Sequence, residues 1–417
     1  MVVGQGFVGL PEAIDFVGAG FNVVGLEQDP RRVKELSSGL SPSPDVSTEE
    51  LAAAYASRRY QIANDPGALS AAAVVVVCVG TPLDDTREPD LSALTSACAQ
   101  IATHVSSPAL IIIESTVPPG TTRQIVLPLL EQSGRKVGRE VFLGFAPERI
   151  DPGNRHFLRA NTPRLVSGIT PECTSLTEAL YQQTVHSVKV VSAPEVAELA
   201  KALENTFRYV NISLVNELAV LSDRLGYSVW EVLDAASTKP FAFLRHEPGP
   251  GVGGSCIPVV PQFLRHAAKQ SDVSSPIIDA ANEINATMPR FVVLKLSRIL
   301  RQRGIDIRQA RILVIGISYK PDIADSRESP ALPVLQALGA AGAHLAYHDP
   351  MLPSLTIGDI TLTSVPCDDK ALRQADCVVI LTLHSSLDPE HLIRHSRLIF
   401  DTRNALRAPD ATNVVVL

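Results

Sequence analysis

The sequence has few cysteines, and nothing in their spacing gives them a shared structural role. The six lie at positions 78, 98, 173, 256, 367 and 377, with no CxxC pair and no His/Cys cluster at zinc-ligand spacing. This scatter excludes a disulfide framework and a structural zinc site, and it is typical of reduced thiols. We therefore predict a cytoplasmic protein without a metal.

Long apolar runs, basic runs and a secretory signal are missing too. No stretch has the length of a membrane span, and the net charge is −7 with a pI near 5.8. An acidic chain without basic-aromatic stretches is a poor nucleic-acid binder, so we expect neither a nucleic-acid nor a membrane partner. Apolar residues are plentiful, at 45% of 417 residues, which is enough to form the cores of about two to three domains. These features favour small-molecule chemistry.

The amino terminus carries a dinucleotide-binding pattern. The motif GxGxxG spans residues 4–9, before a predicted helix over residues 12–18, and Glu27 follows a predicted strand over residues 21–26. The glycines allow a pyrophosphate to approach the helix amino end, and an acidic residue at this distance binds the adenosine ribose and repels a 2′-phosphate. We predict NAD as the cofactor. The predicted contacts are Gly4, Gly6, Phe7, Val8, Gly9 and Glu27.

Three further apolar runs predict strands buried on both faces of a parallel sheet: residues 73–79, 110–113 and 141–145. Thr81, Thr116 and Glu148 follow the ends of these strands. Ligands bind at the carboxyl ends of strands in open α/β sheets, so these residues are predicted to lie on the functional edge. The alternatives are a helix cap for Thr116 and a solvated loop acid for Glu148.

A glycine-rich stretch over residues 248–254 precedes Cys256. Its four glycines allow another group to lie close against the backbone, which would present the thiol of Cys256 to a substrate. The alternative is a glycine-rich loop followed by a buried cysteine, since free cysteine is one of the most buried residue types.

The apolar spacing over residues 194–236 predicts one long amphipathic helix, with a possible break near Gly226. Such a helix is too long for one small domain, so we expect it to join two domains and to dimerise. Lys201 and Asn205 share one face of this helix, with Glu198 beside them. The alternative for these three is a solvated face with one salt bridge.

The last third of the chain predicts a second doubly wound sheet, with its first strand over residues 311–317. The loop after that strand has no GxGxxG motif, but Lys320 and Arg327 offer positive charge that suits a phosphorylated substrate. The alternative is ion pairing with the neighbouring acids Asp322, Asp325 and Glu328.

Taken together, the chain resembles the UDP-glucose/GDP-mannose 6-dehydrogenase family over essentially its whole length. Six blocks follow the order of that family: residues 114–122, 147–154, 198–205, 248–258, 320–330 and 401–404. The resemblance implies an α/β fold of two Rossmann-like, doubly wound domains joined by a long central helix that forms a homodimer. It also implies NAD-dependent, four-electron oxidation of a UDP-sugar at its 6-hydroxymethyl group, a step of polysaccharide biosynthesis. The implied divisions are an NAD-binding domain over residues 1–193, a central helical domain over 194–300 and a nucleotide-sugar-binding domain over 301–417.

The resemblance also implies roles for single residues. Cys256 matches the nucleophile that forms a thioester, Lys201 and Asn205 match the residues that stabilise the oxyanion, Thr116 positions a water and Glu148 assists proton transfer. The residues that match substrate contacts are Glu148, Arg149, Lys201, Asn205, Arg245, Gly253, Lys320, Arg327 and Arg403.

Two blocks bear on the substrate and on activity. The sequences of residues 147–154 and 248–254 resemble the branch of the family that acts on UDP-N-acetylhexosamines. We therefore predict a UDP-N-acetylhexosamine as the substrate, with UDP-glucose as the next candidate. Val260, however, stands where the family has an aspartate that orients water and the lysine. A nucleotide-sugar-binding protein with lost or altered chemistry is therefore the alternative to a working dehydrogenase.

Overall fold

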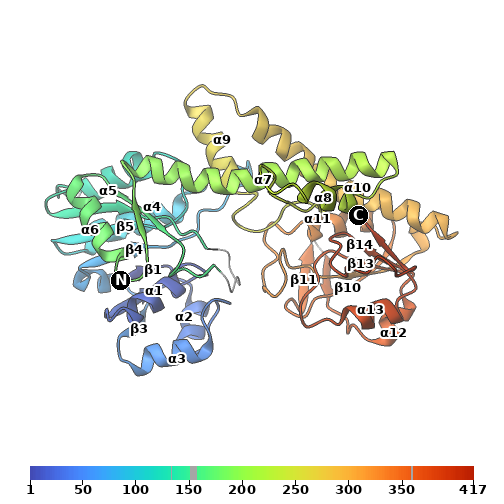
Figure 1. Ribbon diagram of the computed structural model, residues 1–417. Coiled ribbons are helices and arrows are strands. Elements are labelled where there is room, and N and C mark those ends of the chain that lie inside the picture. Colours follow the sequence, from blue (N-terminus) through green and yellow to red (C-terminus); the bar gives the residue numbers. More distant parts are fainter. Residues whose placement is uncertain (133, 151–156, 358–359) are drawn as a thin grey trace. The chain divides into compact units, whose positions relative to one another are not determined.

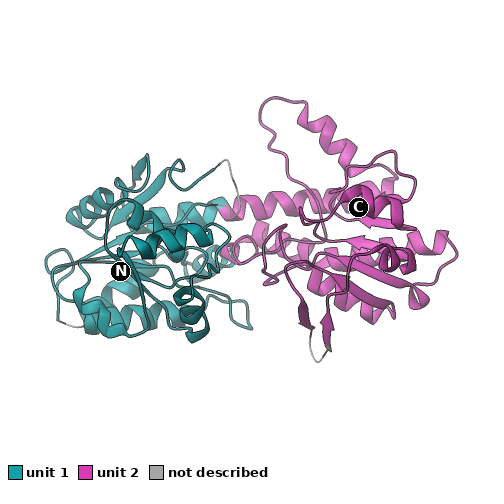
Figure 2. Ribbon diagram, turned by 90° about the horizontal axis from the view of Figure 1, so that it is seen from below, with its two compact units in different colours: residues 1–204, 262–274 teal, residues 205–261, 275–417 magenta. Residues whose placement is uncertain are grey.

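A computed structural model describes residues 1–132, 134–150, 157–357 and 360–417 (Figure 1). The chain forms two compact units, shown in separate colours in Figure 2. Unit 1 contains Met1–Glu204 and Gln262–Ser274, and unit 2 contains Asn205–Pro261 and Ser275–Leu417. The segment predicted as a central domain, residues 194–300, thus contributes to both units.

Unit 1 is built on an eight-stranded sheet of order β3-β2-β1-β4-β5-β6-β7-β8. All neighbouring strands are parallel except β6 and β7. The strands are β1 Val2–Val3, β2 Val23–Leu26, β3 Tyr60–Ala63, β4 Val74–Val77, β5 Ala109–Ile113, β6 Val141–Phe145, β7 Arg164–Gly168 and β8 Val188–Val190. The strand order reverses between β1 and β4, and this switch point is where α/β sheets bind dinucleotides.

The apolar runs of the sequence become central strands because both faces of this sheet are covered. Val75 and Val77 of β4 enter one hydrophobic cluster, and Val76 enters another on the opposite face. The covering elements of unit 1 are α1 Gly9–Gly18, α2 Pro30–Ser37, α3 Thr48–Ala56, η1 Pro66–Ala71, α4 Ser92–His104, η2 Thr122–Val126, α5 Leu127–Glu131 and α6 Pro171–Tyr181.

The predicted long helix is α7, Pro194–Leu225. It ends where predicted, because Gly226 adopts a φ of +80° that favours glycine. The chain resumes as α8, Val229–Ser237, whose first turn is capped by the Ser228 side chain. Two further helices follow, α9 Val260–Gln270 and α10 Pro276–Gln302.

Unit 2 contains a five-stranded parallel sheet of order β10-β9-β13-β14-β15. Its strands are β9 Arg311–Ile315, β10 His344–His348, β13 Cys377–Ile380, β14 Ile399–Asp401 and β15 Val414–Val416. The remaining elements are η3 Ile307–Gln309, α11 Ala331–Ala340, the hairpin β11 Ser354–Ile357 and β12 Ile360–Thr363, α12 Asp369–Gln374 and α13 Pro389–His395. The predicted α/β class with two Rossmann-like sheets is confirmed.

The α7 helix turns most of its large apolar side chains to solvent, and it buries Tyr209, Val215 and several small or polar side chains. We call the exposed set the α7 stripe: Val196, Leu199, Leu203, Phe207, Leu214, Leu221 and Leu225. An exposed apolar surface of this kind is typical of an interaction site. Among the described residues, none of the helices combines the length and the apolar character that a membrane span requires.

Candidate active site

The glycine-rich turn after β1 has the backbone shape that a dinucleotide requires. Gly4 has a φ of +86°, and a Cβ on it would lie 2.7 Å from the Cys78 carbonyl oxygen. A Cβ on Gly9 would lie only 1.9 Å from the Gly4 carbonyl oxygen. Because α1 begins at Gly9 with no side-chain cap from Val8, its positive dipole end faces this turn uncapped. These residues fit the pyrophosphate of NAD.

Glu27 is fixed by the backbone around it. Its Oε2 accepts a hydrogen bond from the Gln5 N–H (2.9 Å), and its Oε1 accepts from the N–H groups of Gln28 and Asp29 (2.8 and 3.0 Å). A carboxylate offers about four acceptor positions, so one remains for a ribose hydroxyl. The predicted role of Glu27 in ribose binding therefore fits this geometry. Backbone N–H groups already use three acceptor positions of its carboxylate, so fewer remain for the ribose.

Two predicted threonines join the ends of neighbouring strands. The Thr81 hydroxyl donates to the Thr116 carbonyl oxygen at 2.5 Å, which ties the loop after β4 to the loop after β5. Both side chains are half-buried. The alternative that Thr116 caps a helix is wrong, because the next helical segment begins at Thr122 with Thr121 as its N-cap residue.

Glu148 is buried, so the alternative of a solvated loop acid is wrong. Its Oε1 accepts a hydrogen bond from the Arg149 N–H at 2.8 Å. Its Oε2 lies 2.6 Å from Nη1 of Arg164, as an ion pair that lacks hydrogen-bond alignment. The Arg149 side chain pairs with Glu204 at 2.6 Å. The rest of this predicted block, Asp151 to Asn154, lies outside the described residues.

Lys201 and Asn205 lie one turn apart on α7 and are both buried, so the alternative of a solvated face is wrong. The Asn205 Nδ2 has no hydrogen-bond partner among the described residues. Glu198 forms no salt bridge with Lys201 and instead accepts the N–H groups of Gly120 and Thr122 at 2.5 and 2.9 Å. A buried cation and an unsatisfied buried amide indicate that this face of α7 is built to bind a polar group.

Cys256 is the exposed cysteine of the six, and the alternative of a buried thiol is wrong. Burial raises the pKa of Cys98 and Cys377 to about 12 and that of Cys367 to about 11. Burial also raises the pKa of Cys78 well above its usual value. Since the thiolate is the reactive form, the raised pKa values disfavour these four thiols as nucleophiles, and exposure favours Cys256.

The glycines before Cys256 are required by the packing of unit 2 itself. A Cβ on Gly253 would lie 2.6 Å from Pro330 Cδ and 2.9 Å from the Glu328 carbonyl oxygen. A Cβ on Gly254, which has a φ of +94°, would lie 2.7 Å from the Tyr319 ring. The loop that carries Cys256 therefore packs directly against residues 319–330, the loop that carries Lys320 and Arg327.

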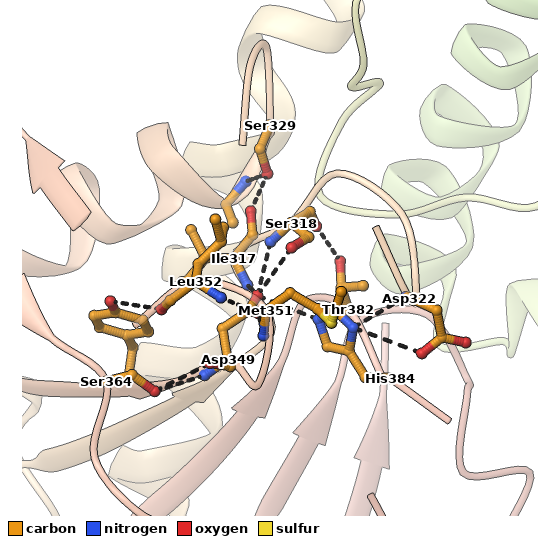
Figure 3. Close-up of polar contacts among 12 residues, drawn as sticks. Ile317, Ser318, Asp322, Ser329, Asp349, Met351, Leu352, Ser364, Thr382 and His384 are labelled. Atoms are coloured by element: carbon orange, nitrogen blue, oxygen red, sulfur yellow. Dashed lines mark hydrogen bonds and ion pairs between the residues drawn. The ribbon is translucent and has the colours of Figure 1, made fainter. Parts of the chain in front are cut away.

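The loop over residues 319–330 is held at its base by two buried side chains (Figure 3). Asp349 accepts hydrogen bonds from the N–H groups of Ile317 and Ser318 (2.7 and 3.0 Å), and His384 Nε2 lies 3.2 Å from the same carboxylate oxygen. His384 Nδ1 accepts the Asp322 N–H at 3.0 Å, so Nε2 carries the proton. Burial opposes ionisation of Asp349, but the hydrogen bonds from His384 and the backbone outweigh it and lower the pKa of Asp349 well below its usual value.

The basic residues predicted to bind a phosphate differ in their contacts. Arg327 forms a two-pronged ion pair with Asp325, with a shortest distance of 2.7 Å. This is the alternative of ion pairing with a neighbouring acid. Arg245 pairs with Asp234 at 2.6 Å. Burial lowers the pKa of Arg403 to about 10, and its guanidinium lies so close to Gly249 that a Cβ there would approach Nη1 to 2.5 Å. Arg403 therefore also belongs to the packing around the cysteine loop.

Comparison with known proteins identifies the relationship. Models of the UDP-glucose/GDP-mannose dehydrogenase family match the chain in three parts: the NAD binding domain over residues 1–185, the central domain over 195–287 and the UDP binding domain over 313–408. The chain belongs to the UDP-glucose/GDP-mannose dehydrogenase family. The predicted class of enzyme, an NAD-dependent dehydrogenase, is thereby confirmed, and so is NAD as the cofactor.

Similar proteins agree with this membership over nearly the whole chain. The chain is 33% identical over 416 residues to a UDP-N-acetyl-D-mannosamine dehydrogenase of Pyrococcus horikoshii, covering 98% of this chain and 96% of that protein. It is 35% identical over 352 residues to a UDP-N-acetyl-D-glucosamine 6-dehydrogenase of Pseudomonas aeruginosa, covering 84% and 82%. A solved structure of a UDP-D-ManNAc dehydrogenase from Pyrococcus horikoshii matches with a TM-score of 0.88 and 31% identity, covering 100% and 98%.

Sequence reasoning in this dehydrogenase missed four buried residues that support the predicted blocks of the site: Asp349, His384, Arg164 and Tyr181. Asp349 follows a predicted strand, and that position at the carboxyl edge of a sheet was the signal that could have identified it. His384 also follows a strand, but its partner lies 35 residues away. Arg164 and Tyr181 carry no local signal, because β7 and its neighbours become visible only in the folded sheet.

Proposed function

We propose that this dehydrogenase oxidises the 6-hydroxymethyl group of a UDP-N-acetylhexosamine to a carboxylate through a thioester on Cys256. The observation that carries the proposal is the packing of the exposed Cys256 loop against the loop of Lys320 and Arg327. The thiol of Cys256 is therefore carried by a loop that packs against the loop of Lys320 and Arg327, two cations that suit a diphosphate. Two similar proteins, named as a UDP-N-acetyl-D-mannosamine dehydrogenase and a UDP-N-acetyl-D-glucosamine 6-dehydrogenase, support the choice of sugar.

The reaction consists of two oxidations and one hydrolysis. In the first oxidation the C6 hydroxyl loses its proton and C6 loses a hydride, which gives an aldehyde. The Cys256 thiolate adds to the aldehyde carbon, and loss of a second hydride from the thiohemiacetal gives a thioester. Water then attacks the acyl carbon, breaks the C–S bond and releases the carboxylate and the thiol. NAD, when bound, accepts one hydride in each oxidation, so each sugar yields two NADH.

The remaining residues are assigned to the charges that develop at C6. Lys201 and the unsatisfied Asn205 amide donate to the oxyanion of the tetrahedral species, since both are buried on α7 and the Asn205 Nδ2 has no hydrogen-bond partner among the described residues. Thr116 positions the water, and Glu148 takes and returns protons. Lys320, Arg327 and Arg403, with Arg245, bind the nucleotide, which requires Arg327 to exchange at least part of its pairing with Asp325.

The test is to incubate the protein with NAD and single sugars and to count NADH formed per sugar consumed. The panel contains UDP-N-acetyl-D-glucosamine, UDP-N-acetyl-D-mannosamine, UDP-glucose and GDP-mannose. We expect two NADH per UDP-N-acetylhexosamine and the highest kcat/KM with one of these two. A ratio of one would exclude the thioester route, and a higher kcat/KM with UDP-glucose would give the sugar assignment to the next choice.

We also propose that the α7 stripe forms a homodimer. Seven large apolar side chains along one helix form a surface that a second copy of the same helix can cover about a two-fold axis. A stable interface of this kind buries roughly 800 Å² on each partner. Leu203→Glu, in the middle of the stripe, should convert a dimer to a monomer in light scattering. Leu176→Glu on α6, also an exposed leucine, is the matched control and should leave the mass unchanged. A wild-type monomer at micromolar concentration would end the proposal.

A further inference from the structure

Unit 1 contains a buried charge network around Arg164, of which the expected mechanism uses only Glu148. Arg164 begins β7, and its guanidinium contacts three carboxylates from separate elements: Glu12 of α1, Glu114 after β5 and Glu148 after β6. The Nη2 atom lies 2.7 Å from Glu12 Oε2 and 3.1 Å from Glu114 Oε1, and Nη1 lies 2.6 Å from Glu148 Oε2. All four side chains are buried.

The guanidinium takes the place that a metal ion could otherwise occupy. Oxygens of the three carboxylates lie within 4.8 Å of one another, a grouping typical of a cation site. Arg164 fills this space, and its guanidinium also lies 4.7 Å from the centre of the Tyr181 ring. Two neutral donors complete the network at Glu114: the Tyr181 hydroxyl at 2.6 Å and the Cys78 thiol at 3.1 Å.

One guanidinium cannot neutralise three buried carboxylates, so the network must retain protons. Burial raises the pKa of Glu12 to about 8, and burial also raises the pKa of Glu114. Glu114 receives two donated hydrogen bonds, which favour its charged form, whereas Oε1 of Glu12 has no hydrogen-bond partner among the described residues. Glu12 is therefore the carboxyl that best retains a proton near neutral pH.

Glu148 is held differently from the other two acids. The Nη1 atom of Arg164 contacts Glu148 alone among the three, while Nη2 is shared by Glu12 and Glu114. The Arg149 N–H fixes the other oxygen of Glu148. Oε2 of Glu148 is itself buried and forms an ion pair with Arg164 without an aligned hydrogen bond, so Arg164 holds this oxygen by charge.

We propose that Arg164 is a positioning residue of the reaction, which fixes the orientation of the Glu148 carboxylate by charge. The inference rests on the proposed role of Glu148 in proton transfer. Removing the buried positive charge removes the attraction by which Arg164 lowers the pKa of Glu12 and Glu114 against the effect of burial. An opposite charge this close typically lowers the pKa of a carboxyl by about 1–3. The groups that face Arg164 and set this titration are Glu12, Cys78, Glu114, Glu148 and Tyr181, with the Asp15–Arg159 pair nearby.

The experiment compares Arg164→Met and Arg164→Lys with the matched control Arg159→Met. Arg159 also pairs with an acid of α1, Asp15 at 2.7 Å, but has no contact with Glu148 among the described residues. The readouts are kcat and KM for UDP-N-acetyl-D-glucosamine and UDP-N-acetyl-D-mannosamine across pH 5–9, and the thermal midpoint of each variant. We expect Arg164→Met to lower kcat about tenfold or more and to move the acidic limb of the kcat profile upward by about one pH unit or more.

The control should lose thermal stability without a shift of that limb. If Arg164→Met fails to fold, Arg164→Lys decides, because lysine keeps the charge but not the two-pronged contact, and a smaller shift with partial loss of kcat is expected. Variants of Arg164 that are less stable but keep the wild-type pH profile would reduce the residue to a structural role and overturn the inference. Glu148→Gln distinguishes the role of Glu148 from that of Arg164. Full activity of Glu148→Gln would overturn the proposed role of Glu148. A slow Glu148→Gln, together with Arg164 variants whose kcat profile against pH is not shifted, would overturn this inference alone.

Discussion

Gly253→Ala tests whether the cysteine loop and the loop of Lys320 form one packed assembly. The change adds a single methyl group three residues before Cys256. Its Cβ would lie 2.6 Å from Pro330 Cδ, 2.9 Å from the Glu328 carbonyl oxygen and 3.1 Å from Tyr319 Cβ. A proline ring and a backbone carbonyl cannot rotate away, so one of the two loops must shift by about an ångström, given that carbon contacts lie near 3.5–4.0 Å.

The magnitude follows from the cost of overpacking. Inserting a methyl group into a well-packed site destabilises by about 1–3 kcal/mol. If the whole of this free energy fell on binding of the nucleotide, the Kd for UDP would rise by about 5- to 150-fold. Gly18→Ala is the matched control, because a Cβ on this exposed helical glycine would meet nothing within 4 Å. That control should be neutral or stabilising by up to about 1 kcal/mol.

The assay is calorimetric titration of the intact protein with UDP, together with thermal unfolding and the rate of Cys256 alkylation. We expect Gly253→Ala to weaken UDP binding, to lower the thermal midpoint and to change the alkylation rate, while Gly18→Ala changes none of these adversely. A variant at Gly253 that binds UDP as tightly and unfolds at the same temperature as Gly18→Ala would refute the packing argument.

Further predictions concern single groups. Burial raises the pKa of Glu12 to about 8 from about 4.5, so the folded protein keeps a proton that the unfolded chain releases. The free energy of unfolding should therefore fall as pH rises from about 5 to 8. Glu12→Gln should reduce this fall by a few kcal/mol, as measured by denaturation at several pH values. Limiting iodoacetamide should label Cys256 first, with protection by UDP-sugar, and peptide mass mapping that finds another thiol first would contradict this. Glu27 should favour NAD over NADP by a few kcal/mol in kcat/KM, and equal efficiencies would refute its role. Val260→Asp should raise turnover about tenfold or more.

The sequence predicted the parts of the fold that follow from short-range patterns. The valines of β4 and the break of α7 at Gly226 both came from local rules, namely burial on two faces and glycine at a helix end. The length and apolar period of α7 also predicted that its apolar stripe would not be buried within one domain, and the stripe is exposed. Periodicity did not reveal the buried face, where Lys201 and Asn205 lie with Tyr209 and Val215.

The candidate site was predicted in its residue types and missed in its supports. The roles predicted for Cys256 and Lys201 came from the order of the family blocks, whereas the spacing of Lys201 alone favoured a solvated face. Their supports depend on contacts between distant segments: Arg164 meets Glu12 across 152 positions of the chain, and His384 meets Asp349 across 35. The glycines before Cys256 illustrate the same limit, since sequence reasoning placed a substrate against them whereas the folded chain places Tyr319 and Pro330 there.

The position of Val260 in the structure bears on the rate of thioester hydrolysis. The valine is buried, begins α9 and donates its N–H to the Cys256 carbonyl oxygen at 2.9 Å, so its side chain is packed while its backbone fixes the cysteine loop. An aspartate at this position would place a carboxylate at the first turn of α9, where the helix dipole stabilises it by about 0.3–1 kcal/mol. Burying the carboxylate opposes this, so Val260→Asp should lose stability even as it gains an acceptor for the hydrolytic water.

Val260→Asn, which has nearly the same shape as Val260→Asp but no charge, is the control. Wild-type protein should accumulate a Cys256 acyl-enzyme in intact mass spectra, and Val260→Asp should abolish that accumulation whereas Val260→Asn does not. Ordinary wild-type turnover without an acyl-enzyme, combined with a slower Val260→Asp, would mean that Val260 only packs beneath the loop and that another carboxylate, Glu148 being the buried candidate, serves the hydrolysis.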